Sequence, residues 1–283
     1  MNCLKKVSHY QMHYMMLKAI FFVVALSSLC IVTNAQKYSG GNGKSSDPYQ
    51  IATTNDLIEL SNADRYSWAN DYFIQTADIV FPEDSSSFDW DGDGTIEWNG
   101  DGSGDDELGF KPIGTSSAMF YNVYNGQHYS IYNLYINRPS GDDSNPTAMF
   151  GYVGYFSFSE GNIINVRLKN VRIKGGDYTA CLVAVGGKWT TNIENSSCSG
   201  TIEGGDNVGG ITGHSNRPVT KSTFFGRILS NGSDAGGLAG FLDNVNNNDN
   251  YSISVVEGNR FVGGLVGDTY DGSYNRTYTI SSI

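Results

Sequence analysis

The chain has 283 residues, with 18 Lys and Arg against 29 Asp and Glu, which gives a formal net charge of −11. Nucleic acids and anionic membranes are bound by clustered basic surfaces, so this charge balance argues against both as partners. Gly accounts for 35 residues, and the 39% hydrophobic and 13% aromatic content can build a core, which argues against disorder. A chain of this composition with only 6 Pro is typical of an all-β repeat protein.

Residues 1–35 are expected to form a signal peptide. An apolar run from Ala19 to Val32 has the length of a signal-peptide core and is too short to span a bilayer. Small residues before Gln36, including Ala35, place the expected cleavage there. No second apolar run follows, so the sequence predicts a secreted or cell-surface protein without a transmembrane span.

Two cysteines, Cys181 and Cys198, lie beyond the expected cleavage site. In an oxidising compartment they can pair, provided that their Cα atoms come within ~7 Å. The alternative is that both are buried thiols that act as small apolar side chains. The sequence leaves these two interpretations open.

Residues 36–111 are predicted to form an N-terminal cap with a short helix. The residues Thr53 and Thr54 precede an apolar pattern with an acid in its first turn, which indicates a capped helix start, and we expect an amphipathic helix over residues 55–69. Residues 36–80 contain too little apolar material for a core of their own. The helix is therefore expected to cover one end of a larger fold.

An acidic insertion follows the expected helix between residues 89 and 107. Asp89, Asp91 and Asp93 alternate and are followed by a Gly, which is how the loop of a calcium site begins, because alternate carboxylates converge on one hard cation. Gly100 stands where an EF-hand needs Glu, so this is not an EF-hand. We expect a calcium site with metal ligands at Asp89, Asp91, Asp93, Asp101 and Asp105, and the alternative is a solvated acidic loop.

Internal repeats are the strongest signal in the chain. The segments VGGITG, AGGLAG and VGGLVG end at Gly213, Gly240 and Gly267, which are spaced 27 residues apart. Apolar residues nine positions apart recur in four units, and the pairs are Ile173 with Leu182, Ile202 with Ile211, Leu229 with Leu238, and Val256 with Leu265.

Each unit of 27–29 residues holds short β-branched runs separated by turn pairs such as GG and GD. Such a unit cannot bury its own apolar face and must stack on its neighbours. The pattern predicts a right-handed parallel β-helix over residues 112–283. Met149, Leu182, Ile211, Leu238 and Leu265 form one internal ladder, and Ile173, Ile202, Leu229 and Val256 form another.

The VGGITG, AGGLAG and VGGLVG units resemble the GLUG motif of bacterial secreted and surface proteins, and the segment GGNGKSSDPYQIATTNDLIEL resembles the opening of such proteins. The resemblance covers about residues 40–283. It implies a right-handed parallel β-helix with an extracellular, adhesin-like role, and it supplies no catalytic residues. The sequence departs from the motif at Ala184, where the final Gly is replaced.

The chemistry-bearing residues favour binding over catalysis. His128 and His214 lie in loop-like sequence without a second His or Cys at metal-ligand spacing. Exposed aromatic side chains can stack on sugars or proteins, and the proposed ligand-binding residues are Tyr124, Tyr129, Tyr132 and Tyr155. We therefore expect a non-catalytic surface adhesin or binding module for an extracellular glycan or a host or surface protein. The alternative is a β-helical polysaccharide lyase or glycoside hydrolase.

Overall fold

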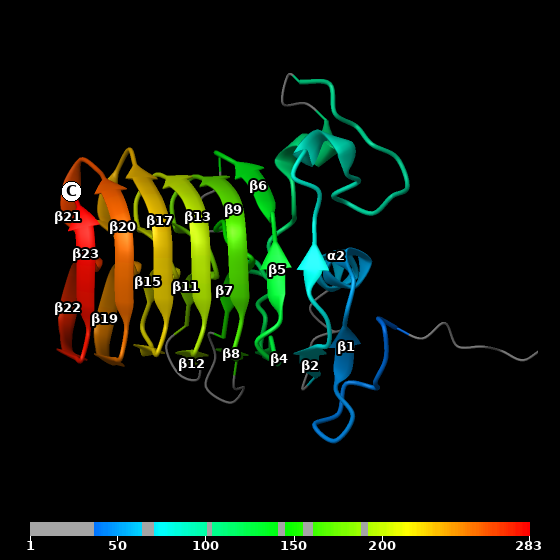
Figure 1. Cartoon of the computed structure of the whole chain (residues 1–283), viewed down its shortest axis with the longest axis horizontal. Helices are drawn as coiled ribbons and strands as arrows, with labels where there is room; N and C mark the ends of the chain where they lie inside the picture. The colour runs from blue at the N-terminus through cyan, green and yellow to red at the C-terminus, as the bar shows by residue number, and fades with distance from the viewer. Residues whose placement is uncertain (1–36, 64–70, 101–103, 141–144, 155–160, 188–191) are drawn as a thin grey trace, which may run out of the picture. The chain divides into compact units, whose positions relative to one another are not determined.

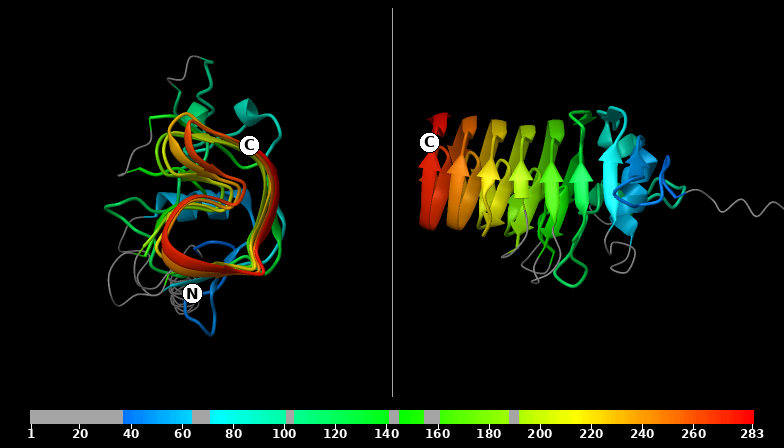
Figure 2. Two further views of the ribbon diagram at one scale, coloured as in Figure 1. Left: turned by 90° about the vertical axis from the view of Figure 1, so that its left-hand side faces the viewer. Right: turned by 90° about the horizontal axis from the view of Figure 1, so that it is seen from below.

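The computed structural model describes residues 37–63, 71–100, 104–140, 145–154, 161–187 and 192–283, apart from the side chains of residues 244 and 245. The signal peptide predicted at 1–35 lies outside these residues. The described chain winds into a parallel β-solenoid of about seven turns (Figures 1 and 2). The all-β fold class and the parallel β-helix are thus confirmed.

The described strands form three sheets that run along the solenoid. The eleven-stranded sheet contains β1 (Tyr49–Ile51), β2 (Tyr72–Gln75), β4 (Val123–Asn125), β7 (Phe150–Val153), β8 (Asn162–Ile164), β11 (Val183–Gly186), β12 (Asn192–Glu194), β15 (Thr212–Ser215), β16 (Val219–Thr220), β19 (Ala239–Asn248) and β22 (Val266–Asn275). The four-stranded sheet contains β10 (Thr179–Ala180), β14 (Val208–Gly209), β18 (Ser233–Gly236) and β21 (Arg260–Gly263). The eight-stranded sheet contains β3 (Ile79–Val80), β5 (Ser130–Tyr132), β6 (Tyr135–Arg138), β9 (Arg167–Gly175), β13 (Ser197–Gly204), β17 (Thr223–Ser230), β20 (Tyr251–Glu257) and β23 (Tyr278–Ser282).

The first predicted ladder is present in the interior. Strand pairing sets Leu182 beside Met149 on one side and beside Ile211 on the other, and the backbone amide of Leu238 donates to the carbonyl of Leu265 at 2.7 Å. Four of the five side chains are at most 1% exposed, and Leu265, on the last described coil, is partly buried. Stacked apolar side chains from successive coils therefore form the core.

The second ladder differs from the prediction at one coil. Ile202 pairs with Ile228 rather than with Leu229, and Ile228 pairs in turn with Val256. Ile228 is fully buried, whereas Leu229 is only partly buried and faces the other side of the strand. Side chains alternate along a strand, so a one-residue error in register moves a residue to the opposite face. The extra residue of this coil lies in the turn between β17 and β18.

The solenoid begins earlier than the predicted boundary at residue 112. Strand β1 pairs in parallel with β2, and β2 pairs in parallel with β4, so both belong to the eleven-stranded sheet. The first coils contain large aromatic side chains in place of the aliphatic ladder, with Phe73 and Phe120 at a ring separation of 6.0 Å. The N-terminal region is therefore part of the β-helix, together with a helix and an insertion.

The helix α2 (Thr54–Asn62) begins at the predicted capping residues. Thr53 accepts a hydrogen bond from the backbone amide of Asp56 at 3.1 Å, and the Asp56 carboxylate accepts one from the backbone amide of Thr53 at 2.9 Å. This capping box explains where the helix starts. Leu57 and Leu60 are fully buried, so the helix packs against the core. Residues 64–69 of the predicted helix lie outside the described residues. No helix in the described chain is long and apolar enough to cross a membrane.

Cys181 and Cys198 form a disulfide between consecutive coils, with their Cα atoms 6.5 Å apart. Cys181 lies between β10 and β11, Cys198 lies on β13, and both side chains are buried. The pairing left open by the sequence is thus present in the structure. Because the bond joins two coils through the interior, it links neighbouring repeats covalently.

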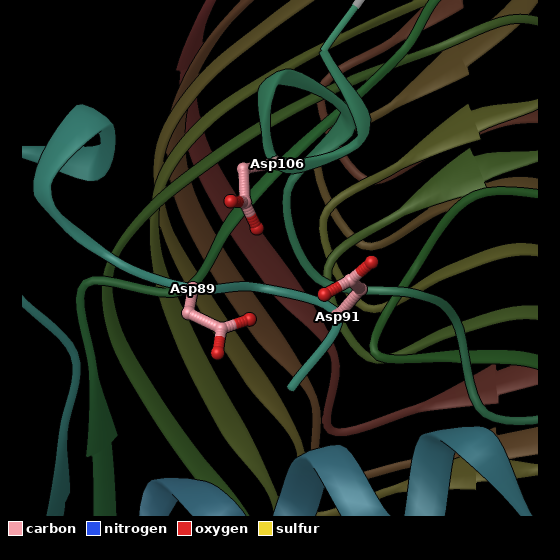
Figure 3. Close-up of side chains that lie close together, drawn as sticks. All are labelled: Asp89, Asp91 and Asp106. Carbon is pink, nitrogen blue, oxygen red and sulfur yellow. The ribbon is translucent and has the colours of Figure 1, made fainter. Parts of the chain in front are cut away.

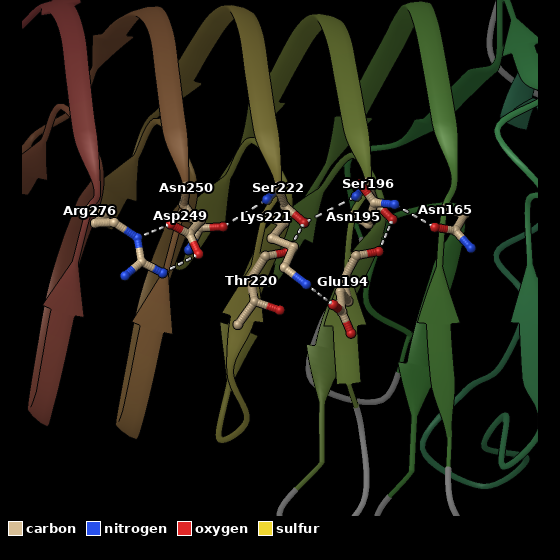
Figure 4. Close-up of polar contacts among 10 residues, drawn as sticks. All are labelled: Asn165, Glu194, Asn195, Ser196, Thr220, Lys221, Ser222, Asp249, Asn250 and Arg276. Atoms are coloured by element: carbon tan, nitrogen blue, oxygen red, sulfur yellow. Dashed lines mark hydrogen bonds and ion pairs between the residues drawn. The ribbon is translucent and has the colours of Figure 1, made fainter.

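One corner of the solenoid carries a column of residues in the left-handed conformation, between the eleven-stranded and eight-stranded sheets (Figure 4). Asn165, Asn195, Lys221, Asp249 and Arg276 have φ between 48° and 60°. Asn tolerates this conformation better than most residues. Within the column, Asn195 Nδ2 donates to Asn165 Oδ1 at 2.6 Å and Arg276 Nη2 donates to Asp249 Oδ2 at 2.7 Å. The column continues the inter-coil hydrogen bonding around the corner.

The repeated glycines lie where two backbone segments approach each other. A Cβ atom on Gly240 would lie 2.5 Å from the carbonyl carbon of Asn207 and 2.7 Å from the carbonyl oxygen of Asp234. No side chain fits at these separations. The final Gly of the repeated motif therefore allows backbone segments of the same coil and of the preceding coil to approach each other closely beside the four-stranded sheet.

Candidate functional site

Three carboxylates of the acidic insertion converge. Asp89, Asp91 and Asp106 each offer an oxygen, and these atoms all lie within 4.8 Å of one another (Figure 3). Asp106 is fully buried and belongs to the 3₁₀ helix η3 (Asp105–Leu108), whereas Asp89 and Asp91 follow the 3₁₀ helix η2 (Ser85–Ser87). Oxygen ligands of this kind suit a hard cation such as calcium. The two ends of the insertion thus supply one potential cation site.

Asp106 is the member of this group that the sequence reasoning missed. Its carboxylate accepts hydrogen bonds from the backbone amides of Trp90 and Glu97, the second at 2.8 Å. The neighbouring Glu107 accepts one from Asn99 at 2.7 Å. Alternate spacing could not reveal Asp106, because it reaches the group by closure of the loop and not by local sequence.

The structure does not bring together the remaining predicted metal ligands. Asp93 Oδ1 accepts hydrogen bonds from the Thr95 backbone amide at 2.8 Å and from the Thr95 hydroxyl at 2.7 Å, so its carboxylate closes a turn. Asp105 is exposed and is not in the group of three. Asp101 lies outside the described residues. The group therefore contains two of the five predicted ligands.

The convergence of these acids changes the proton affinity of Asp91. Burial raises the pKa of Asp91, and a side-chain hydrogen bond with Asp89 and the charges of Asp93 and Asp106 raise it further. In contrast, the hydrogen bonds from Thr95 lower the pKa of Asp93. A cation among Asp89, Asp91 and Asp106 would offset both the loss of solvation of Asp91 and the smaller repulsion from its neighbouring acids.

A cavity of about 590 Å³ lies between this loop and helix α2. Asp89 and Asp91 line it from the loop, and Asn55, Glu59 and Asn62 line it from the helix. Asn62 Nδ2 donates to the Asp91 carbonyl at 2.8 Å, which joins the two segments. Further oxygen atoms and solvent therefore have room beside the acidic group.

The four tyrosines predicted to bind a ligand have different environments. Tyr124 is fully buried against Phe150, so it belongs to the core and its prediction as a surface residue is wrong. Tyr129 is 40% exposed. Tyr132 is partly exposed, and Tyr155 lies outside the described residues. Tyr124 points inward because it pairs with the inward-facing Phe73 and Ile163 of neighbouring strands.

Basic side chains from β9 accompany the aromatic side chains of β5 and β6. Lys169 Nζ lies 3.1 Å from the Tyr132 hydroxyl and 4.9 Å from its ring centre, and this hydrogen bond lowers the pKa of Tyr132. The Arg172 guanidinium lies 5.4 Å from the ring centre of Tyr135. Both arrangements have the geometry of a cation–π contact.

A groove of about 370 Å³ crosses strands β6, β9 and β13 of the eight-stranded sheet. We call it the Tyr135 groove, and its lining residues are Tyr135, Ile136, Asn137, Arg172, Ile173, Lys174, Thr201 and Glu203. It offers an aromatic ring beside an amide, two cations and a carboxylate, and Lys174 and Glu203 form an ion pair at 2.8 Å. Pockets with one apolar surface and a few convergent polar groups suit small ligands and short segments of polymers.

The acidic insertion borders this groove. The Tyr135 hydroxyl lies 3.4 Å from the Glu107 carbonyl, and Asn137 Nδ2 donates to the same carbonyl at 3.2 Å. The ring of Tyr135 also packs against Trp98, with ring centres 5.8 Å apart. Burial in this cluster raises the pKa of Tyr135. The conformation of the acidic loop thus helps to fix the position of Tyr135.

His214, unlike His128, has a packing role. Its ring stacks against Tyr178 at a centre separation of 5.9 Å and contacts Phe241 edge to face at 5.0 Å. Burial lowers the pKa of His214, which favours the neutral ring. His128 is exposed in a turn with φ of 64°. His128 thus lies in a turn as the sequence predicts, whereas His214 lies on strand β15 and is partly buried, so its expected loop position is wrong.

The chain has limited similarity to known proteins. No family model matches the chain. A segment is 31% identical over 174 residues to halomucin of Haloquadratum walsbyi (strain DSM 16790 / HBSQ001), and the match covers 61% of this chain and 2% of halomucin. The chain thus spans a very small part of that relative. A crystal structure described as a putative immunoglobulin A1 protease from Bacteroides ovatus has a TM-score of 0.48 at 17% identity, covering 86% of this chain and 78% of that chain.

Proposed function

We propose that the protein is an exported, non-catalytic β-helical module of the GLUG-repeat type that binds a glycan or protein ligand at the cell surface. The similarity to a segment of halomucin supports an extracellular location. The buried disulfide between Cys181 and Cys198 supports it independently, since such bonds persist in oxidising compartments. The net charge of −11 argues against nucleic acid as the ligand.

The observation that carries the binding role is the Tyr135 groove. The Tyr135 ring contacts Trp98 and the Arg172 guanidinium and offers its remaining exposed surface to a ligand, while the exposed Arg172 and Lys174 side chains offer hydrogen-bond donors. Glycan recognition uses this combination of an aromatic face and polar groups at its edge. The rigid pairing of β6 with β9 and of β9 with β13 holds these groups in fixed positions. Little ordering would be required on binding.

We also propose that calcium binds to this protein in a structural role. We place it among Asp89, Asp91 and Asp106, where it would bridge the two ends of the acidic insertion. Because the Glu107 carbonyl contacts Tyr135 and Asn137, an ordered insertion would also support the groove. Extracellular calcium modules commonly bind at ~10⁻⁴–10⁻³ M, so high affinity is not required.

The test is a glycan and surface-protein array probed with the purified chain in millimolar calcium. We expect saturable binding to a small set of related ligands and no change in the mass of those ligands after incubation. Absence of any saturable ligand would contradict the binding role, and cleavage of a bound glycan would instead favour the polysaccharide-active alternative.

A further inference from the structure

A second pocket lies at the end of strand β6, and none of Asp89, Asp91 and Asp106 lines it. It has a volume of about 310 Å³, near the lower limit for small-molecule sites. We call it the Arg138 pocket. Lys111 and Arg138 provide its two cationic side chains, and Leu108, Pro112 and Pro146 provide apolar walls. Among the described residues that line it, none is acidic.

Arg138 is incompletely paired in this pocket. Its Nη2 donates to the Gly109 carbonyl at 3.3 Å, while its buried Nε has no hydrogen-bond partner in the described part of the chain. No ion pair joins Arg138 to a carboxylate of the described residues, although the charge of Asp105 acts on it from a longer distance. Burial lowers the pKa of Arg138, which reflects the cost of holding this cation away from water.

The pocket therefore has the positive charge and the hydrogen-bond donors that bind a small anion. A guanidinium is planar and matches the geometry of a carboxylate, and Lys111, whose Nζ lies 3.5 Å from Asn62 Oδ1, adds a second positive charge at the exposed rim. Thr115, Ser140 and Asn145 also line the pocket and carry hydroxyl and amide groups suited to sugar hydroxyls. The small volume limits the occupant to about one saccharide unit.

We propose that the Arg138 pocket binds the carboxylate of a sugar acid, such as a uronate unit of an acidic glycan. This inference rests on the proposed glycan-binding function and names the class of glycan. The carboxylate accepts hydrogen bonds from the part of the Arg138 guanidinium that lines the pocket, and the saccharide ring lies against the apolar walls.

The experiment is a calorimetric titration of the chain with sodium glucuronate, glucose and sodium sulfate in parallel. We expect saturable millimolar binding of glucuronate, binding at least about tenfold weaker for Arg138→Gln, and weaker binding for Lys111→Gln. Lys169→Gln is the matched control, because Lys169 is an exposed cation on the same sheet beside Tyr132, and it should bind glucuronate normally. Glucose should show no saturable binding.

Three results would overturn the proposal. These are an absence of saturable glucuronate binding up to ~100 mM, equal binding by Arg138→Gln in a variant that melts like the parent, or equal binding of glucose. Binding of sulfate as tight as that of glucuronate would overturn the sugar-acid assignment and leave a general anion site. Arg172→Ala removes a cation of the Tyr135 groove and a hydrogen bond to the Glu83 carbonyl, but it changes no residue of the Arg138 pocket. Retained glucuronate binding with loss of array binding would support two separate sites, and loss of glucuronate binding would overturn the assignment to the Arg138 pocket.

Discussion

Ile202 on β13 lies directly beside Ile228 on β17, and the adjacent Leu229 lies on the other side of the strand. Ile228 occupies the interior ladder although it stands ten residues before Leu238, whereas in the three other coils the spacing is nine. The turn after β17 contains the additional residue. The core therefore preserves the direction of the side chain and lets the turn length vary.

This register predicts that substitutions at Ile228 and Leu229 change the stability by different amounts. Ile228→Ala should lower the free energy of unfolding by ~2–5 kcal/mol, because it leaves a cavity in the ladder. Leu229→Ala should lower it by less than ~1 kcal/mol, because that side chain is only partly buried. Urea melts of both variants measure the difference. A larger loss for Leu229→Ala would show that the register is wrong.

The corner column predicts an unusual order of substitutions at Asn195. Its φ of 52° penalises residues with a Cβ, so Asn195→Ala should cost ~1 kcal/mol more than Asn195→Gly. Both variants lose the hydrogen bond to Asn165, so the difference isolates the backbone conformation. Chemical denaturation of the two variants and the parent measures it. Equal stability of the two variants would contradict the left-handed conformation.

The disulfide predicts a redox-sensitive stability. A bond that joins residues 17 positions apart should stabilise the folded chain by ~3 kcal/mol, mainly by restricting the unfolded state. Dithiothreitol should therefore lower the melting temperature of the parent. The double variant Cys181→Ala and Cys198→Ala provides the control, since its melting temperature should not respond. A parent that melts identically with and without reductant would argue against the bond.

Calcium removal tests the acidic group. EDTA should lower the melting temperature and millimolar calcium should restore it, because an ion that binds only the folded state adds RT ln(1 + [L]/Kd) to stability. Asp91→Asn should abolish this response. It should also melt slightly higher than the parent in EDTA, because it removes a carboxylate whose pKa is raised mainly by burial and further by the charges of Asp93 and Asp106.

Asp93→Asn is the matched control for that experiment. Asp93 lies two residues away, but its carboxylate binds Thr95 and is not in the group of three. It should retain the calcium response. Identical melts of the parent in EDTA and calcium would indicate a hydrated acidic loop, and loss of the response in Asp93→Asn alone would indicate a different set of ligands.

The sequence predicted the features that repeat and missed those that depend on closure of the chain. Fixed spacing identified the ladder from Met149 to Leu265 and the parallel fold, because every coil must bury an equivalent residue. The spacing pattern did not reveal which polar residues are buried. Asn247 lies in a run of asparagines and reads as a surface residue, yet it is fully buried and accepts a hydrogen bond from the Val219 amide at 2.9 Å.

The candidate sites illustrate the same limit. Asp89 and Asp91 were visible as a local pattern, whereas Asp106 joins them from 15 residues beyond Asp91. The Tyr135 groove combines side chains from β6, β9 and β13, whose contact depends on the register of successive coils. Register depends on turn lengths that vary between units, so spacing alone does not determine which surface side chains become neighbours.

The central claim is that the outer face of β6, β9 and β13 binds the ligand. The most direct measurement is the affinity of an array-identified ligand for the parent, for Arg172→Ala with Lys174→Ala, and for Tyr278→Ala. Tyr278 is 58% exposed on β23 of the same sheet, several coils from the groove, and so provides a matched surface control. The account predicts at least about tenfold weaker binding for the groove variant and unchanged binding for Tyr278→Ala. Unchanged affinity of a folded groove variant would contradict it.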